Sequence, residues 1–441
     1  MDNNTINEAL SQIVDPDLNK DIVSLGFVKE IKIAGGAVSI DLELTTPACP
    51  VRDQFRSRAK ELVGALPGVE TVEVNLSSRK PVRKPEAKQS GLDTVDSIIA
   101  VASGKGGVGK STIAAAMAME LVRQGYRVGL LDMDIYGPSV PTLFEHHEVG
   151  LAGDDNNMVV PENKEGLLVM SFGFWLGPQP AIMRGPMVTN YVQQFLHQVN
   201  WGTLDYLFLD LPPGTGDVQI TLTQSVQMDG AVIVTTPHAL SGADVGKAIQ
   251  MFDKVSVPIL GVIENMSYFE APDTGKRYHI FGRGAAQRIA EHYGLPILGQ
   301  LPISAQEFGG PTTRSPRSSE LRSAVEQTVR YLGMSRAGRS HPEEEHDEHT
   351  LSLVWPDGEK VAIDLRTLRA GCRCAVCVDE YSGKPLLNIA SIPEDIHPTA
   401  VGRIGNYALS IDWSDGHTTG FFPYSRIREL AGKTEGVETH R

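Results

Sequence analysis

The segment VASGKGGVGKST at residues 101–112 constrains the fold of this chain more than any other. The apolar run SIIAVAS (97–103) that leads into it is typical of a buried strand, and the residues after it have a helical pattern. Glycines allow backbone conformations that direct several N–H groups at one phosphate, and a helix N-terminus adds partial positive charge there. The order strand, GKGGVGKS, helix therefore predicts a P-loop that binds a nucleotide.

Specific contacts with ATP and Mg²⁺ follow from this loop. We expect Lys110 to reach the β- and γ-phosphates and Ser111 to bind the Mg²⁺ ion. The alternative is a glycine-rich turn without a ligand, which the complete motif between a strand and a helix disfavours. The residues expected at the nucleotide are Gly104, Lys105, Gly106, Gly107, Val108, Gly109, Lys110, Ser111 and Thr112.

Short apolar runs recur along the middle of the chain and alternate with helical patterns. Such runs are typical of strands that are buried on both faces. Their alternation with helices predicts an α/β fold, a P-loop NTPase with a mostly parallel sheet covered by helices on both faces. The apolar runs lie at 127–134, 206–212, 231–237 and 258–265, and helical patterns lie at 217–227 and 242–254.

Polar residues end three of these apolar runs. Asp210 precedes LPPGTGD, where a carboxylate can hold the magnesium through water. Asp132 and Asp134 lie in LLDMDIYGPS, and either can orient the attacking water, although Asp134 can equally be a helix N-cap or a turn former. Asn265 can recognise the adenine or can be a polar turn residue.

Two polar stretches divide the 441 residues into three parts. The basic, proline-containing stretch 81–92 and the charged stretch 335–349 predict linkers. The P-loop domain then covers 93–334, flanked by a small α+β domain at 1–80 and a small β-rich domain at 350–432.

The chain has four cysteines, too few for a disulfide framework. Cys372, Cys374 and Cys377 have C-x-C-x2-C spacing, so three thiolates can converge on one metal. Tetrahedral zinc requires a fourth ligand, and an iron–sulfur cluster is the competing interpretation because thiolates suit both. Cys49 precedes a predicted helix whose N-terminus would favour a thiolate; it is either a cluster-contacting thiol or a small buried residue.

Charge and hydropathy exclude some classes of function. The chain has 40 Lys and Arg against 54 Asp and Glu, a formal net charge of −14, which argues against broad binding to nucleic acid or to a membrane surface. We see no apolar run of about 18 residues, so no transmembrane helix is expected. The first residues, MDNNTINEAL, lack an apolar signal core, and we therefore expect a cytoplasmic protein.

Several motifs of the middle segment together resemble the Mrp/ApbC family of iron–sulfur cluster carrier ATPases, in the class that includes MinD and the nitrogenase iron protein. This resemblance implies a homodimer with weak ATPase activity that takes clusters from scaffold proteins and transfers them to apo client proteins. It also implies that Lys105 reaches the nucleotide of the partner subunit, which makes Lys105, Lys110 and Asp134 the expected catalytic residues. The motifs are GKGGVGKS, DMDIYGPS, MRGPM (183–187), DLPPGTGD, VTTPHALSGADV (234–245) and GVIENMSYF (261–269).

The flanking segments carry resemblances of their own. DPDLNKDIVSLGFV (15–28) and TTPACPVRD (45–53) resemble the small domain of PaaD/SufT-type metal–sulfur assembly proteins, which supports Cys49 as a cluster-contacting thiol. The pattern WPDG, LR, CRCAVC, WSDGH in the last segment resembles the N-terminal zinc domain of gamma-butyrobetaine hydroxylase. That second resemblance implies that His417 completes a zinc site with the three clustered cysteines.

One departure from the carrier family affects the cluster. Shorter Mrp/ApbC chains have a CxxC after the SYF motif, whereas this chain has Ala271 and Thr274 there, so the usual cluster at the dimer interface cannot form in that way. The three-part layout without CxxC resembles chloroplast cluster carriers of the high-chlorophyll-fluorescence type and their bacterial relatives. Any Fe–S cluster must use Cys49, the C-terminal cysteines or both. The alternatives are a MinD/ParA-like positioning ATPase and a scaffold that binds nucleotide and zinc without a cluster.

Overall fold

A computed structural model describes most of the chain, and it divides into two compact units. The first comprises Met1–Ala102, Gly109–Val232 and Ser304–Ala337, and the second comprises Ser103–Val108, Ile233–Ile303 and Gly338–Arg441. The described residues are 2–18, 20–49, 51–78, 91–135, 137–145, 150, 152–154, 159–176, 195–214, 219, 223, 225–238, 241–255, 257–303, 319–336, 342–355, 360–372, 374, 376–378, 384–404, 408–418 and 420–435.

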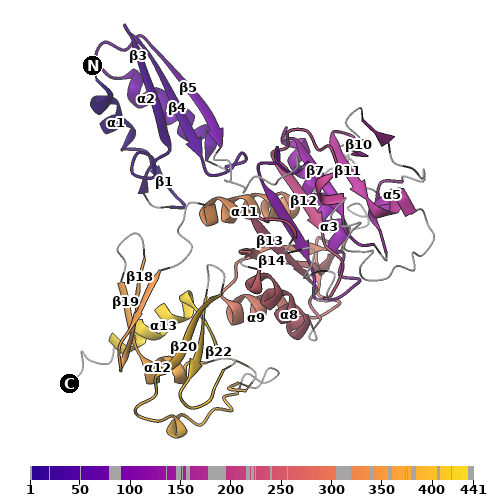
Figure 1. Cartoon of the computed structure of the whole chain (residues 1–441), viewed down its shortest axis with the longest axis vertical. Coiled ribbons are helices and arrows are strands. Elements are labelled where there is room, and N and C mark those ends of the chain that lie inside the picture. The colour runs from indigo at the N-terminus through magenta and orange to yellow at the C-terminus, as the bar shows by residue number, and fades with distance from the viewer. Residues whose placement is uncertain are drawn as a thin grey trace. The chain divides into compact units, whose positions relative to one another are not determined.

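The N-terminal part of the first unit is a three-stranded sheet with two helices on one face (Figure 1). Burial alternates along its central strand, with Val38, Ile40 and Leu42 on the buried face, as expected for a sheet covered on one side. The helices add Leu10 and Phe55 to the same core. The elements are α1 (Asn3–Leu10), β1 (Val14–Asp15), β2 (Lys20–Asp21), β3 (Val28–Ala34), β4 (Ala37–Leu44), α2 (Arg52–Gly64) and β5 (Thr71–Ser78).

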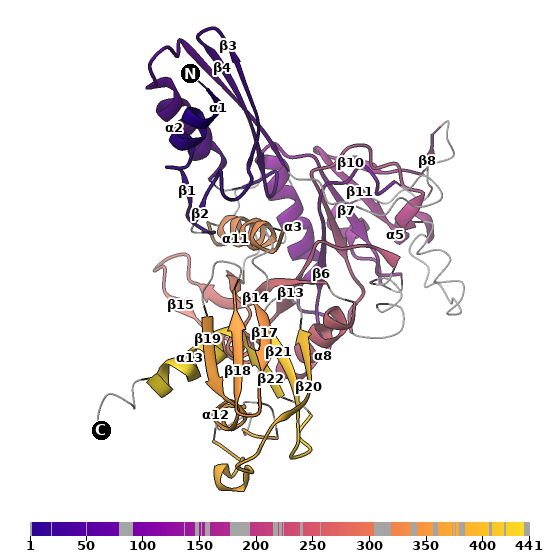
Figure 2. The ribbon, with the colours of Figure 1, turned by 60° about the vertical axis from the view of Figure 1, so that its left-hand side comes forward.

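The rest of the first unit carries the P-loop strand and helix. Strands β11, β7, β12 and β6 are parallel neighbours in this order, and β10 is antiparallel at the edge. All residues of β6, β7 and β12 are buried, and α11 packs against α3 (Figure 2). The elements are β6 (Ile98–Ala102), α3 (Lys110–Arg123), β7 (Val128–Asp132), α4 (Val140–Leu143), β8 (Ala152–Gly153), β9 (Val159–Val160), β10 (Glu162–Lys164), β11 (Leu167–Ser171), α5 (Phe172–Leu176), β12 (Tyr206–Asp210) and α11 (Ser319–Arg336).

The sheet continues through β13, whose residues are divided between the two units. In the second unit β14 pairs in parallel with β16 and antiparallel with β15. This mostly parallel sheet with helices between its strands confirms the predicted α/β fold. The elements are β13 (Gly230–Thr235), α8 (Ser241–Lys254), β14 (Ile259–Glu270), β15 (Arg277–Tyr278), α9 (Ala285–Tyr293) and β16 (Ile297–Pro302).

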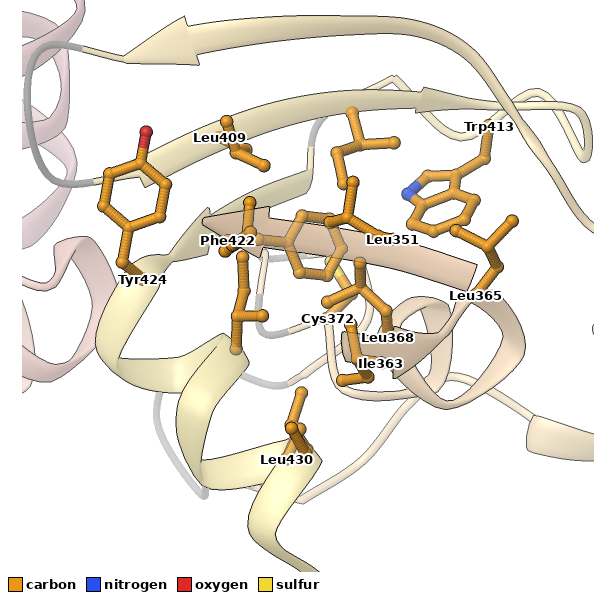
Figure 3. Close-up of a cluster of buried hydrophobic side chains, with 14 of the residues drawn as sticks. Leu351, Ile363, Leu365, Leu368, Cys372, Leu409, Trp413, Phe422, Tyr424 and Leu430 are labelled. Carbon is orange, nitrogen blue, oxygen red and sulfur yellow. The ribbon is translucent and has the colours of Figure 1, made fainter. Parts of the chain in front are cut away.

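The C-terminal part of the second unit consists of two three-stranded antiparallel sheets with helices between and after them. Its core is apolar and includes three cysteines; Figure 3 shows Cys372 within this cluster, together with Leu368 and Phe422. The elements are β17 (Glu343–His346), β18 (Thr350–Val354), β19 (Lys360–Asp364), α12 (Leu365–Ala370), η1 (Ile389–Ser391), β20 (Pro398–Ile404), β21 (Ala408–Trp413), β22 (Gly420–Pro423) and α13 (Tyr424–Glu435).

Part of the stretch 335–349 that we interpreted as a linker is regular structure. Helix α11 reaches Arg336, and β17 occupies Glu343–His346. Strand β17 has the sequence EEEH and no apolar side chain, so the pattern gave no strand signal; its backbone nevertheless pairs with β18 at the edge of the sheet. Of the other predicted linker, 81–92, only Gly91 and Leu92 are described, and Leu92 is buried. In the described part of the chain, no helix combines the length and the apolar character that a membrane span needs.

Candidate functional site

The P-loop has the backbone conformation that its glycines were expected to supply. Gly107 and Gly109 have φ angles of 78° and 83°, in the left-handed region that L-residues with side chains rarely adopt. Helix α3 begins immediately after Gly109, at Lys110. The loop therefore leads from the buried end of β6 to a helix N-terminus, where backbone N–H groups are available to an anion.

Lys110 and Asp210 form a buried ion pair at the start of this helix. Their side chains are 6% and 0% exposed, and the ammonium contacts Asp210 Oδ1. The same ammonium lies 3.3 Å from Ser111 Oγ. Burial raises the pKa of Asp210, whereas the neighbouring Lys110 lowers it. The second oxygen, Asp210 Oδ2, is buried and has no hydrogen-bond partner among the described residues. A carboxylate oxygen beside a serine hydroxyl fits the donor set that Mg²⁺ prefers.

Asp132 and Asp134 have different roles at the end of β7. Asp132 is fully buried and accepts hydrogen bonds from Ser171 Oγ at 2.9 Å, Val140 N at 3.2 Å and Asp134 N at 3.1 Å. Burial and the nearby Asp210 raise the pKa of Asp132 to about 7. Asp134 is only partly buried, and its Oδ1 accepts a hydrogen bond from Gly137 N at 3.1 Å. Asp134 thus takes part in the turn after β7, and its expected role with the attacking water stays a prediction.

Asn265 contacts the phosphate-binding loop itself rather than solvent. It is 1% exposed, its Nδ2 donates to Val108 O at 2.9 Å, and its Oδ1 accepts from Met266 N at 2.9 Å. These partners differ from the adenine contact that we expected, and they make Asn265 a residue that fastens the loop. Lys105 is partly buried, and its carbonyl accepts a hydrogen bond from Ser103 Oγ at 2.9 Å. Residues 183–187 and 215–217 of the sequence motifs lie outside the described residues.

Sequence reasoning missed Glu264, which precedes Asn265 in β14. Its carboxylate is 1% exposed and accepts hydrogen bonds from Ala286 N at 3.0 Å, Gln300 Nε2 at 2.9 Å and Ser267 Oγ at 2.5 Å. Ala286 lies in the first turn of α9, so Glu264 joins β14 to a helix N-terminus and to β16. An acidic residue inside an otherwise apolar run was the available signal.

Cys49 differs from its expected state. Helix α2 begins three residues later, at Arg52, but burial raises the pKa of the Cys49 thiol to about 11, so the prediction of a favoured thiolate is wrong. Desolvation here outweighs the hydrogen bond from the backbone of Val51. The thiol borders a cavity of about 320 Å³, and the preceding residue, Ala48, donates its N–H to the buried Tyr206 Oη at 2.8 Å.

The three C-terminal cysteines and His417 converge on one point. His417 Nε2 lies 3.4 Å from the sulfur of Cys372, 3.5 Å from that of Cys374 and 3.8 Å from that of Cys377. The four ligand atoms all lie within 4.8 Å of one another, and all four side chains are buried. Three sulfurs and one imidazole nitrogen fit a tetrahedral zinc ion. The geometry accordingly provides a Cys–His group able to hold a metal, which we call the Cys–His centre.

Two segments bring these ligands together. The cysteines follow α12, and a tight turn with Cys377 N bonded to Cys374 O at 2.8 Å directs them inward. His417 follows β21 in a turn that is closed by Trp413 N to His417 O at 2.9 Å. Burial raises the pKa of Cys377, and the hydrogen bond with Cys374 is the largest cause that raises the pKa of Cys372.

The hairpin between β14 and β15 carries the positions of the absent CxxC. Ala271 N bonds to Lys276 O at 3.0 Å, and Gly275 N bonds to Ala271 O at 2.8 Å. Ala271 and Thr274 lie in this turn, so the hairpin offers no thiolate at either position.

Comparison with known proteins gives a consistent result for each part of the chain. A family model described as NUBPL iron-transfer P-loop NTPase matches residues 94–331. Models for an iron-sulfur cluster assembly protein and for the gamma-butyrobetaine hydroxylase-like N-terminal domain match residues 3–75 and 343–428.

Individual relatives agree with the family models. The chloroplastic Fe-S cluster assembly factor HCF101 of Oryza sativa subsp. japonica is 40% identical over 438 residues, which cover 96% of this chain and 82% of that protein. The iron-sulfur cluster carrier protein of Synechocystis sp. is 45% identical over 304 residues, or 67% and 85% of the two chains. A solved nucleotide-binding protein from Archaeoglobus fulgidus in complex with ADP has 38% identity and a TM-score of 0.44, covering 55% of this chain and 89% of its own. Since the first family model spans more than half of the chain, the chain belongs to the NUBPL iron-transfer P-loop NTPase family.

Proposed function

We propose that this protein binds ATP, hydrolyses it slowly as a homodimer, and carries iron–sulfur clusters to apo client proteins. The observation that carries the nucleotide part is the buried Lys110–Asp210 pair beside Ser111 at the N-terminus of α3. The names of the relatives, a cluster assembly factor and cluster carriers, support the cargo. The three matched ranges support three domains, close to the expected 1–80, 93–334 and 350–432, with the last beginning by Glu343.

Each residue of the nucleotide site has a proposed task. Lys110 and the loop N–H groups bind the phosphates, and Ser111 and Asp210 hold the Mg²⁺ ion, which neutralises phosphate charge when bound. Asp134 orients the attacking water once the nucleotide is present. Lys105 of a second copy places another cation on the phosphates, so that ATP joins the two subunits.

Three of the four cysteines are assigned to a structural metal, and the fourth is assigned to the iron–sulfur cluster that the protein carries. We assign zinc to Cys372, Cys374, Cys377 and His417, since a closed set of four ligands is typical of structural zinc. Cys49 then remains as the thiol that contacts the cluster, one in each subunit. Cys49 must lose its proton to bind iron, and its pKa, raised to about 11, lowers the apparent affinity for iron at neutral pH, which suits a carrier that gives its cargo away.

A contact within the first unit supports coupling between nucleotide and cargo. Ala48 N, one residue before Cys49, bonds to Tyr206 Oη at the start of β12. Strand β12 ends at Asp210, the proposed Mg²⁺ ligand. Strand β12 therefore connects Asp210 directly to the hydrogen bond at Ala48, and a shift of Asp210 on nucleotide binding would move the loop that carries Cys49.

Anaerobic reconstitution with iron and sulfide tests this function. We expect wild type to take up a cluster and transfer it to apo-ferredoxin, a Cys49→Ser variant to lose both properties, and a Cys372/Cys374/Cys377 triple serine variant to lose zinc. Full cluster content and transfer by Cys49→Ser would remove Cys49 from the mechanism. A wild type that binds ATP and zinc but no cluster would instead support the scaffold function, which Ala271 and Thr274 favour.

A further inference from the structure

Arg369 is a buried cation next to the Cys–His centre. It lies in the last turn of α12 and is 4% exposed. Its Nε donates to Asp415 Oδ2 at 2.9 Å, and its Nη1 donates to Cys377 Sγ at 3.5 Å. A guanidinium suits this position because its planar fork can donate to two acceptors at once, which a lysine ammonium does less well.

Asp415 extends the same chain of contacts to the histidine. Its Oδ1 accepts a hydrogen bond from His417 N at 3.1 Å, while its Oδ2 accepts from Arg369. One carboxylate therefore holds the turn that presents His417 and the arginine that contacts Cys377. The pair joins the two segments that carry the metal ligands, which are separated by about 40 residues in the sequence.

We propose that Arg369 and Asp415 are positioning residues that set how tightly the Cys–His centre holds its metal. The inference rests on the proposed binding of zinc at this centre. The N–H donated to Cys377 stabilises the thiolate, and the ion pair keeps both ligand segments at the right separation before the metal arrives. Groups that orient metal ligands in this way typically contribute about 10- to 100-fold in metal affinity.

A second ion pair in the same domain provides a matched control. Arg426 and Glu429 lie one turn apart on α13, with Arg426 Nη1 2.7 Å from Glu429 Oε2, so this ion pair lies within one helix and does not join the two ligand segments. If Arg369 contributed only as a general ion pair of the domain, removal of either arginine would change zinc binding equally. If Arg369 and Asp415 position the metal ligands, only substitutions at these two residues will weaken zinc binding.

The experiment uses full-length wild type, Arg369→Gln, Arg369→Lys, Asp415→Asn and Arg426→Gln. The zinc dissociation constant is measured by competition with a chromophoric chelator, and the ligand field is read from the visible spectrum of the Co²⁺-substituted protein. We expect wild type and Arg426→Gln to bind one zinc with equal affinity. Arg369→Gln and Asp415→Asn should bind about 10- to 100-fold more weakly and shift the Co²⁺ bands, with Arg369→Lys between them and wild type.

The outcomes separate this inference from the proposed function. Zinc affinities and Co²⁺ spectra that are unchanged in both Arg369→Gln and Asp415→Asn would overturn the positioning role and leave the zinc assignment intact. A wild type that binds neither zinc nor Co²⁺ would overturn both. If Arg369→Gln does not fold even in excess zinc, the nearly isosteric Asp415→Asn decides by the same two measurements.

Discussion

The nucleotide site and the Cys–His centre both bury titratable groups, but they compensate the cost of burial differently. At the nucleotide site a buried cation, Lys110, contacts a buried anion, Asp210, so the two charges stabilise each other without a ligand. At the Cys–His centre the four buried groups are three cysteine thiols and one imidazole, and the pKa values of Cys372 and Cys377 are raised. The difference teaches that the first site compensates its charges within the protein, whereas the second gathers groups that can hold a metal.

Loss of one ligand of the Cys–His centre should have the largest effect. In full-length Cys374→Ser we expect zinc content near zero and rapid proteolysis within 343–435, because structural zinc contributes about 10 kcal/mol or more to folding in small domains. Metal analysis and limited proteolysis measure this, with Cys49→Ser as the control that keeps its zinc. A Cys374→Ser protein with full zinc content and the same protease resistance would contradict the assignment.

Substitution of Lys105 tests whether one subunit's own residues are sufficient for ATP hydrolysis. In Lys105→Ala, nucleotide binding should persist because Lys110 and the loop remain, whereas kcat should fall by about 10³-fold, as when a cation supplied in trans is removed. ATP-induced dimerisation should also be lost. Steady-state ATPase and light scattering at saturating ATP provide the measurements. An unchanged kcat would show that this lysine has no part in hydrolysis.

The buried ion pair predicts a specific pattern of stabilities. Lys110→Met leaves Asp210 buried without its cation and should cost about 3–5 kcal/mol in the free energy of unfolding, while also weakening ATP binding. The double variant Lys110→Met/Asp210→Asn should recover most of this loss. Burial raises the pKa of Asp210, so its carboxyl group binds a proton more readily in the folded state. The single variant should therefore become more stable relative to the double variant as the pH falls. Chemical denaturation of wild type, the single variant and the double variant at pH 5 and pH 7.5 measures these free energies. Equal stability of the single and double variants would show that Lys110 does not compensate the buried charge of Asp210.

Cys49 provides the smallest and most local test. Its pKa of about 11 lies above the ordinary value of 9.0, so its contribution to stability is present below about pH 9 and is lost as the pH rises through 11. Alkylation of zinc-loaded protein by iodoacetamide should therefore be slow at pH 7.5 and rise about tenfold per pH unit up to about pH 11. Cys49→Ser supplies the background rate. A rate that already levels off below pH 9 would mean an ordinary thiol.

Much of the nucleotide site and of the Cys–His centre could be predicted because the motifs that form them are short segments of the sequence. GKGGVGKS, the apolar strands around it and the C-x-C-x2-C spacing each lie within a few residues, and each predicts its own chemistry. His417 required a resemblance, because one histidine in a turn has no pattern of its own. Arg369 and Asp415 were missed for the same reason: an arginine and an aspartate 46 residues apart have no shared pattern until folding brings them together.

The amino-acid sequence by itself determined the α/β fold class, the place of the phosphate-binding loop and the metal-ligating cysteines, because periodicity, glycine content and ligand spacing are properties of short segments. Only the tertiary structure decided the partners of Asn265, which fastens Val108 across 157 residues, and the raised pKa of Cys49. The physical reason is that desolvation and long-range pairing depend on what other segments bring to the same place. Local sequence placed a cysteine before a helix N-terminus, and burial in the folded protein raises the pKa of its thiol.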